Sequence, residues 1–266
     1  MKHDISYYRK IHGTYGVSSV KEAQIRSIRQ NVTGSFQNTI NWEQVFVNHS
    51  TDEQDLEIIP TIDIYTKKFK TRPSEVMRLG DLIEWRDALW IVNTLDADNQ
   101  INYQGTMVQC NLCLRWQLED GTIHEEFGWD KDASKYSYGE DRGNYMDTAQ
   151  FTMKVIVQVN EQTLSIRRNK RFLIGPFGVG FTPLAVEVSR INGVTNTYKY
   201  KEGTEQYESG LLEFTLHETQ FYPDRDNAEL GIADYFVIGK DSSVPEPAPE
   251  KTSPPKSVVS EGGEWF

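Results

Sequence analysis

The residues that most resemble a redox or zinc-binding motif are two cysteines in the pattern Cys110-Asn111-Leu112-Cys113. Both uses need the two thiols on one side of the backbone. The surrounding pattern predicts a β-strand, and an odd spacing on a strand directs the two side chains to opposite faces. A zinc site would also need further ligands, and the five histidines are scattered. We therefore expect structural cysteines, with Cys110 in the core and Cys113 half-buried.

Two aspartate pairs, Asp96 with Asp98 and Asp224 with Asp226, have the spacing that begins a calcium-binding loop. Such a loop also needs a glycine at its sixth position and a glutamate at its twelfth, and neither segment has them. Aspartate is common in turns because its side chain hydrogen-bonds to nearby backbone amides. The sequence therefore predicts turns at both places and no bound metal.

Two further patterns could belong to an enzyme. The glycine-rich segment at 175–180 lacks the lysine and the Ser or Thr of a phosphate-binding loop, and no helical pattern follows it. Glu125, Glu126 and Asp130 could form the carboxylate pair of a glycosidase, but charged residues make up 25% of the chain, so such neighbours arise by chance. The sequence predicts no catalytic residue, no cofactor and no enzyme activity.

A basic cluster, formed by Arg167, Arg168, Lys170 and Arg171, stands in a chain whose net charge is −11. It is too short for a nucleic-acid surface, which needs a larger excess of lysine and arginine. We expect the cluster to pair with acidic residues across an interface, where charge sets register and orientation. A solvated strand face explains the cluster equally well.

The composition indicates a β-rich protein. The 266 residues are enough for two modest domains or one large β domain, and an aromatic content of 12% beside only 38% hydrophobic residues is typical of sheets with many polar turns. The N-terminal residues lack the apolar core of a signal peptide, and no window is apolar enough to cross a membrane. With two cysteines, the sequence predicts a protein kept in a reducing cytoplasm.

Residues 1–41 are predicted to form an arm and a short helix. The first 16 residues are polar and rich in tyrosine, including Tyr7 and Tyr8, and glycines interrupt any regular structure. Ser19 and Glu22 then fit a capping box, and apolar residues recur at helical spacing until Gly34 interrupts them.

The stretch at 80–116 is densest in apolar and aromatic residues, and we expect a first β domain, 42–148, around it. Alternation begins at Trp42 and is expected to include Ile58, Ile62 and Ile64. A hairpin turning at 86–88 follows, then a turn at 96–99 and, after Gly105, one long strand. That strand would place one apolar face inward, made of Val108, Cys110, Leu112, Leu114 and Trp116.

The rest of the chain is expected to form a second β domain, 149–240, and a tail, 241–266. The polar loop at 128–148 marks the boundary between the two domains. Strands are predicted at 151–159, 185–191, 211–221 and 232–238, with a hairpin turn at Asn192-Gly193. The tail is rich in proline and serine and ends in Trp265 and Phe266, which could anchor in a partner's pocket. A solvated tail is the alternative.

Part of this sequence resembles structural proteins from the neck region of tailed bacteriophages that infect Gram-positive bacteria. The resemblance rests on FKTRPSEVMRLGDLIEWRDALWIV and on the CNLCLRW strand with its EDGTI turn. In that pattern a G-D-x-I-x-W hairpin precedes a W-[IL]-V strand and a C-N-x-x-L-[KR]-W strand. The matching positions are Gly80, Asp81, Ile83, Trp85, Trp90, Ile91, Val92, Cys110, Asn111, Leu114, Arg115 and Trp116. RRNKRFLIG and DNAELGIADYF extend the likeness over roughly residues 69–236.

The resemblance implies a virion protein at the head–tail junction, assembled in the host cytoplasm. As a connector or head-closure protein it would form a ring with copies of itself, touch portal or adaptor and tail proteins, and let DNA pass without sequence-specific binding. An acidic lumen would avoid retaining the phosphate backbone. The residues expected to contact partners are Tyr7, Tyr8, Arg167, Arg168, Arg171, Trp265 and Phe266.

Two alternatives stay open. The chain could be a tail or baseplate component of the same kind of particle. It could also be a carbohydrate-binding or carbohydrate-hydrolysing β-sandwich, which would use exposed tryptophans and paired carboxylates. The sequence leaves each β domain open between a barrel and a sandwich.

Overall fold

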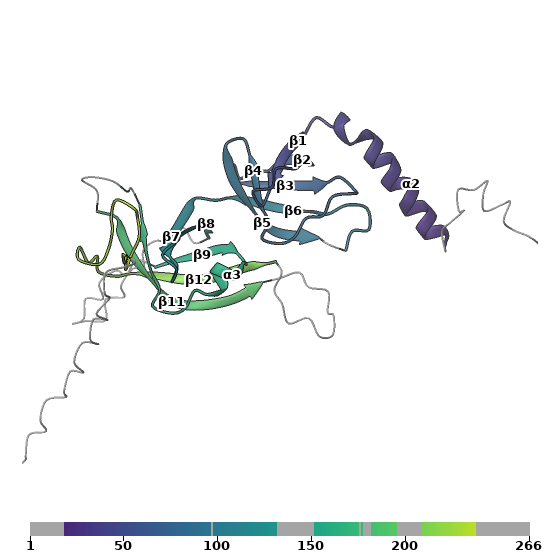
Figure 1. Ribbon diagram of the computed structural model, residues 1–266. Helices are drawn as coiled ribbons and strands as arrows, with labels where there is room; N and C mark the ends of the chain where they lie inside the picture. Colours follow the sequence, from purple (N-terminus) through teal and green to yellow (C-terminus); the bar gives the residue numbers. More distant parts are fainter. Residues whose placement is uncertain are drawn as a thin grey trace, which may run out of the picture. The chain divides into compact units, whose positions relative to one another are not determined.

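The computed structural model describes residues 19–96, 98–131, 152–175, 177, 182–195 and 209–237. This part of the chain is mainly β and begins with one helix, α2 (Val20–Ser35), and a short 3-10 turn, η1 (Phe36–Asn38). The remainder forms two six-stranded sheets (Figure 1). The mainly β fold with a short N-terminal helix is therefore confirmed, whereas the predicted arm and tail lie outside the described residues.

Helix α2 begins where the capping signal predicts. The Ser19 side chain accepts a hydrogen bond from the Glu22 amide at 3.2 Å. Gly34 does not interrupt the helix, which continues to Ser35. None of the helical side chains is buried by the described residues, and Ile28 is 47% exposed. The apolar stripe of this helix is therefore only partly covered in the described part of the chain, with Ile25 and Val32 half-buried.

The first sheet is a closed antiparallel barrel with the strand order β1-β2-β3-β6-β5-β4. Closure leaves no exposed strand edge in this sheet. Its strands are β1 (Trp42–Val47), β2 (Glu53–Pro60), β3 (Thr66–Thr71), β4 (Leu82–Trp85), β5 (Ala88–Asp96) and β6 (Gln104–Gln109). Alternate residues fill the interior, among them Val45, Leu56, Phe69, Ile83, Ile91 and Met107.

The predicted hairpin at 80–92 is confirmed as β4 and β5. Arg86 and Asp87 form its two-residue turn with φ values of 50° and 59°. Two successive positive φ values match the twist of a tight hairpin. The Arg86 guanidinium lies 4.6 Å from the Trp85 ring and pairs with Glu43 at 2.6 Å, which fixes the turn against β1.

The alternation predicted through Ile62 and Ile64 is wrong. β2 ends at Pro60, and both isoleucines lie in the turn that leads to β3. Asp63 organises this turn, because its carboxylate accepts hydrogen bonds from the Tyr65 amide at 3.0 Å and the Thr66 hydroxyl at 2.7 Å. Both isoleucines are exposed as a result.

The second sheet has the order β10-β11-β12-β9-β8-β7, and its edge strands β10 and β7 approach each other. A short helix, α3 (Glu161–Leu164), lies between β9 and β10. The strands are β7 (Leu112–Gln117), β8 (Ile123–Asp130), β9 (Thr152–Gln158), β10 (Arg171–Ile174), β11 (Leu184–Thr195) and β12 (Leu211–Glu218). The core includes Leu114, Val155, Val157, Phe172, Val186, Phe214 and Leu216.

The long strand predicted from Gly105 to Trp116 is wrong, because it is two strands in different sheets. β6 ends at Gln109 in the barrel, and β7 begins at Leu112 in the second sheet. Between them the Cys110 amide donates to the Leu89 carbonyl at 2.8 Å and the Asn111 amide to the Gly128 carbonyl at 3.1 Å. The two sheets therefore divide at 110–111, not in the loop at 128–148, most of which lies outside the described residues.

Two further expectations for the second sheet are wrong. Asn192 and Gly193 do not form a hairpin turn, since β11 continues to Thr195 through an irregular register. Gly193 has φ 136°, which suits such a break in register. The segment predicted as a strand at 232–238 is not a strand over its described residues, 232–237. Its β-type pairing there is limited to one isolated bridge, between Asn227 and Ile232.

The barrel and the second sheet share part of one core. Ile156 of β9 and Leu211 of β12 belong to the barrel's cluster of buried residues. Gly80 has φ 87°, and a Cβ there would lie 2.0 Å from the Gly210 carbonyl oxygen. Only glycine fits this approach of two backbones. The neighbouring Asp81 carboxylate accepts hydrogen bonds from the Arg78 amide at 2.6 Å and the Asn48 side chain at 2.8 Å.

Candidate functional site

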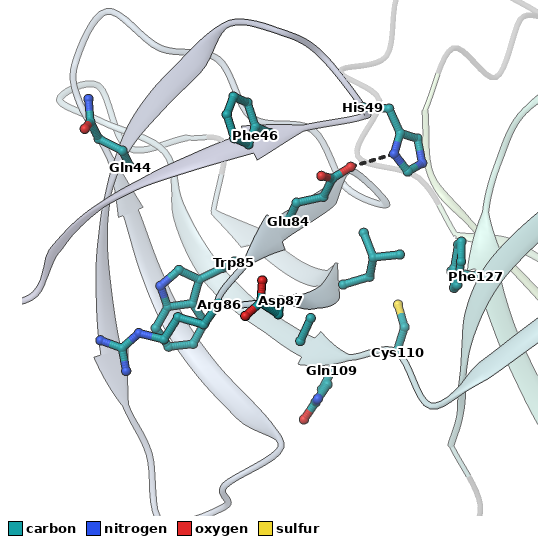
Figure 2. A pocket seen from close by; sticks show the side chains of 12 residues that line it. Gln44, Phe46, His49, Glu84, Trp85, Arg86, Asp87, Gln109, Cys110 and Phe127 are labelled. Carbon is teal, nitrogen blue, oxygen red and sulfur yellow. Dashed lines mark hydrogen bonds and ion pairs between the residues drawn. The ribbon is translucent and has the colours of Figure 1, made fainter.

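An open pocket of about 810 Å³ lies beside the β4–β5 hairpin (Figure 2). We call it the hairpin pocket. Its walls come from β1, from the hairpin itself and from the crossing between the sheets, and β8 contributes one aromatic ring. The lining residues are Gln44, Phe46, His49, Glu84, Trp85, Arg86, Asp87, Ala88, Leu89, Gln109, Cys110 and Phe127.

The pocket presents aromatic surface on a rigid frame. Phe46 is 37% exposed on the outer face of β1, and the half-buried Trp85 and Phe127 lie at two other sides of the pocket (Figure 2). The Trp85 ring lies 5.5 Å from the ring of Trp90, which is in the barrel core. Aromatic groups held in this way form binding surfaces with little loss of side-chain freedom.

The pocket is lined by two acidic side chains, Glu84 and Asp87, beside the basic Arg86, His49 and two glutamines. Glu84 lies 2.6 Å from His49 Nδ1 (Figure 2), and Arg86 is neutralised by Glu43 outside the pocket lining. The Asp87 side chain is exposed and has no hydrogen bond or ion pair within the described part of the chain. Asp87 is therefore the acid of this pocket that is left to attract a positive charge beside an apolar group.

Cys110 cannot serve as a nucleophile at neutral pH. Burial, and then the negative charge of Glu126, raises the pKa of its thiol to about 12. Burial also raises the pKa of Cys113. Both cysteines are free and half-buried, so Cys113 lies as predicted whereas Cys110 is not fully in the core. Among the described residues, no three His, Cys, Asp or Glu side chains are placed to hold a metal ion.

A buried carboxylate lies on the inner face of β8. Glu126 is 3% exposed, and its Oε2 accepts a hydrogen bond from Asn160 at 2.6 Å and lies 3.3 Å from His124 Nε2. The His124 ring packs against Trp116 with ring centroids 4.6 Å apart. Burial raises the pKa of Glu126, and the hydrogen bonds from Asn160 and His124 offset part of this rise.

Glu125 and Glu126 do not form a glycosidase pair on β8. Glu125 faces outward and pairs with Arg115 at 2.8 Å, whereas Glu126 faces inward. Consecutive residues of a strand point to opposite faces, so these two carboxylates cannot flank one bond. The sequence signal for the buried site was weak, because only the alternation of His124 with Glu126 pointed to a polar inner face.

Arg171 is buried and is used within the chain. Its guanidinium makes two hydrogen bonds to Asp226, at 2.9 and 2.7 Å, and further ones to Asp234 and to the Gln220 carbonyl. It also lies 4.7 Å from the Tyr222 ring. The expectation that Arg171 pairs with acidic residues across an interface is therefore wrong, because those acids lie 55 and 63 positions away in the same chain.

The second proposed calcium loop is part of the same cluster. Burial alone would raise the pKa of Asp226, but the hydrogen bonds from Arg171 and from the Tyr222 amide hold this pKa below its usual value. The aspartate is thus the counter-ion of an arginine. At the first loop, the Asp98 amide donates to the Asp96 carboxylate at 3.2 Å, as expected for a turn.

The other residues expected to contact partners are only partly described. Arg167 and Arg168 are exposed and donate to the carbonyls of Leu164, at 2.6 Å, and Ser189, at 3.1 Å. Their role toward a partner stays a prediction. Four more of these residues lie outside the described part of the chain: Tyr7, Tyr8, Trp265 and Phe266. Most of the glycine-rich segment at 175–180 also lies outside it.

No helix in the described residues is both long and apolar enough to cross a membrane.

Comparisons with known proteins give no family. No protein-family profile and no curated protein matches the chain. Among solved structures, the chain is similar to MrkH, described as a c-di-GMP-dependent transcription regulatory factor, with 12% identity and a TM-score of 0.23 over 76% of this chain and 84% of that one. A second structure, MrkH from K. pneumonia, gives 8% identity and a TM-score of 0.24 over 75% and 86%. TM-scores this low support no conclusion.

Proposed function

We propose that this chain is a structural virion protein of a tailed bacteriophage. In this proposal it is a head–tail connector or head-closure protein that forms a ring between the portal and the tail. The observation that carries the proposal is the sequence pattern at 80–116, which resembles phage neck proteins.

Several residues of this sequence pattern make contacts that the fold depends on, which supports the interpretation of the pattern as the signature of a fold. Gly80 allows the backbone contact at Gly210, and Asp81 ties the start of β4 to Asn48. Asn111 accepts a hydrogen bond from the Asp130 amide at 2.9 Å, where the chain enters the second sheet. The pattern thus describes the junction of a barrel with a second sheet, a rigid unit suited to repeated assembly.

The chemistry of the described residues favours a structural role over the carbohydrate-hydrolysing alternative. The Cys110 thiol stays protonated, and Glu125 and Glu126 face opposite sides of β8. Arg171, the one buried member of the basic cluster, is neutralised by Asp226. A net charge of −11 also suits a surface past which DNA moves without being held by its phosphates.

A nonsense mutation in the gene, introduced in the phage that carries it, tests the proposal. We expect DNA-filled heads and finished tails that do not join, seen by electron microscopy, and we expect the chain in wild-type virions by mass spectrometry. Virions that lack the chain, or mutants that still produce joined particles, would overturn the proposal.

The same experiment separates the alternatives. A tail or baseplate component would leave heads without finished tails when it is missing. Hydrolysis of a cell-wall glycan by the purified chain would instead support the carbohydrate-active alternative. The matched control for that assay is the chain with Glu126→Gln, which keeps the shape of the only carboxylate that is buried on β8.

A further inference from the structure

The turn between β2 and β3 exposes three large hydrophobic side chains. Ile62 is 105% exposed, Ile64 67% and Tyr65 60%. We call residues 61–65 the apolar tip. Single exposed hydrophobic residues are ordinary, but three within four positions form a patch of the kind that marks an interaction site.

The apolar tip has a defined shape. The carboxylate of Asp63 accepts hydrogen bonds from Thr66 and from the Tyr65 amide, and these bonds lower the pKa of Asp63. The Thr61 hydroxyl lies 2.6 Å from the Thr66 carbonyl oxygen and closes the base of the turn. A tip that is already ordered loses little conformational freedom when it binds.

The hairpin pocket has the matching chemistry. In this pocket Phe46, Trp85 and Phe127 present an apolar surface to which the apolar tip could bind. The volume of the pocket, about 810 Å³, lies in the range of known ligand-binding sites. None of the pocket's lining residues belongs to the apolar tip, so the pocket is not filled by the tip of its own chain.

Each surface carries charges of both signs, with two lysines beside Asp63 at the tip and two carboxylates beside Arg86 and His49 in the pocket, so lysine prevails at the tip and carboxylate in the pocket. Lys67 donates to the Ile64 carbonyl at 2.7 Å, which places its ammonium group at the tip, and Lys68 is exposed next to it. Glu84 and Asp87 lie in the pocket. Opposite charges around an apolar contact set its register and speed its formation.

The tip and the pocket belong to different strands of the barrel. The tip joins β2 to β3, whereas the pocket is built on β1, β4 and β5. A contact between two different patches of identical chains is heterologous, and it forms a ring when the rotation between copies closes.

We propose that the apolar tip of one copy inserts into the hairpin pocket of the next copy and so makes the head-to-tail contact of the ring. This inference rests on the proposed function only in requiring a ring of copies. Ile62 and Ile64 pack on Phe46, Trp85 and Phe127, and Lys67 and Lys68 face Glu84 and Asp87.

A photo-crosslinker tests the contact in the full chain. Benzoylphenylalanine replaces Ile62, and heavy-isotope and unlabelled copies are mixed before irradiation so that crosslinks between copies carry both labels. We expect such crosslinks in the peptides that contain Phe46, Trp85 or Phe127. The matched control places the same group at Ile40, which is 99% exposed in another turn and should not reach the pocket.

Crosslinks within one chain, crosslinks to another surface, or none at the highest soluble concentration would overturn the inference. So would crosslinks from position 62 to a different protein when the same variant is assembled into virions. The outcome is separable from that of the proposed function. A chain that is present in virions but lacks this crosslink refutes the inference alone, and a crosslinked ring whose chain is absent from virions refutes the function alone.

Substitutions give a second readout, the self-association constant from sedimentation velocity. Ile62→Asp should raise the dissociation constant by about ten- to a hundredfold, as expected for a central apolar anchor, and Ile40→Asp should leave it unchanged. Lys68→Glu and Asp87→Lys should each weaken association, and the two together should restore it. Equal effects of Ile62→Asp and Ile40→Asp, or no recovery in the double variant, would count against the contact.

Discussion

Two buried carboxylates, Glu126 on β8 and Asp226 beside β10, have pKa values that shift in opposite directions. Asp226 is 7% exposed, and the hydrogen bonds from Arg171 and from the Tyr222 and Asp234 amides together outweigh the effect of burial and keep its pKa low. Glu126 is 3% exposed, and its hydrogen-bond partners within the described residues are Asn160 and His124, so burial dominates and its pKa is raised. The partner, more than the degree of burial, decides which form the fold favours.

The difference separates two structural roles. The Arg171 cluster draws the segment around Tyr222 and Asp234 onto β10 through charged hydrogen bonds, so its removal should loosen that segment. The Glu126 carboxylate is a buried charge on the inner face of the second sheet, and burial favours its protonated form. We therefore expect loss of an Arg171 contact to be costly and neutralisation of Glu126 to be favourable at neutral pH.

Arg171→Met should produce the largest effect. It leaves Asp226 buried without its counter-ion, and breaking a buried pair on one side costs about 3–5 kcal/mol of unfolding free energy. Urea unfolding followed by tryptophan fluorescence measures this change. The control is Arg225→Ala, since Arg225 is 57% exposed and pairs with Asp234 in the same cluster; its cost should stay within about 1 kcal/mol. Equal costs would show that Arg171 acts as ordinary packing.

The cost of Arg171→Met should depend on pH in one direction. Because the pKa of Asp226 is lowered in the folded chain, its ionised form stabilises the fold above the unfolded value of about 3.9, and this contribution is lost as the pH falls through the folded pKa. Without Arg171 the same carboxyl gains from protonation. The difference in stability between wild type and variant should therefore shrink by about 1 kcal/mol or more between neutral and acidic pH. A constant difference would contradict the pairing.

Glu126→Gln should have the opposite sign and a smaller size. A folded pKa above the unfolded one means that the ionised form costs stability at neutral pH and that this cost disappears as the pH falls below about 4.3. The variant should be more stable than wild type by about 1 kcal/mol near pH 7 and equal to it in acid. Thermal unfolding across this pH range measures both. Loss of stability at pH 7 would mean that the charge is stabilised by His124.

Local signals were enough for elements whose partners are neighbours in the chain. The cap at Ser19, the β4–β5 hairpin and the strand at 152–158 all follow from short-range alternation or turn chemistry. The break at 110–111 could not be found in this way. Val108 and Leu112 keep the same alternation across it, while the strands that pair with them change from one sheet to the other.

The candidate site shows the same limit. The hairpin signal placed Trp85 beside Arg86, but Phe46 and Phe127 reach the pocket only through the pairing of distant strands. Ile62 and Ile64 keep the parity of Ile58, so alternation alone predicted a strand. Hydrogen bonds to Asp63 make the turn instead and expose the tip.

The smallest effect concerns the thiol that lies near Glu126. Burial is the main reason that the pKa of Cys110 is about 12, and the charge of Glu126 is the lesser cause. Glu126→Gln removes only that lesser cause, so the rate of Cys110 alkylation by iodoacetamide at alkaline pH should rise by only about two- to threefold. Cys113 provides a comparison within the same molecule and should respond less, because Glu125 is the carboxylate that raises its pKa most and Glu126 is the least of the causes that act on it. Peptide mass spectrometry resolves the two sites. A more than tenfold rise in the alkylation rate of Cys110 would mean that the charge of Glu126, and not burial, holds the thiol protonated. Burial would then be a weak influence at this position, and the difference between the pKa shifts of Glu126 and Asp226 would have to come from their charged neighbours alone.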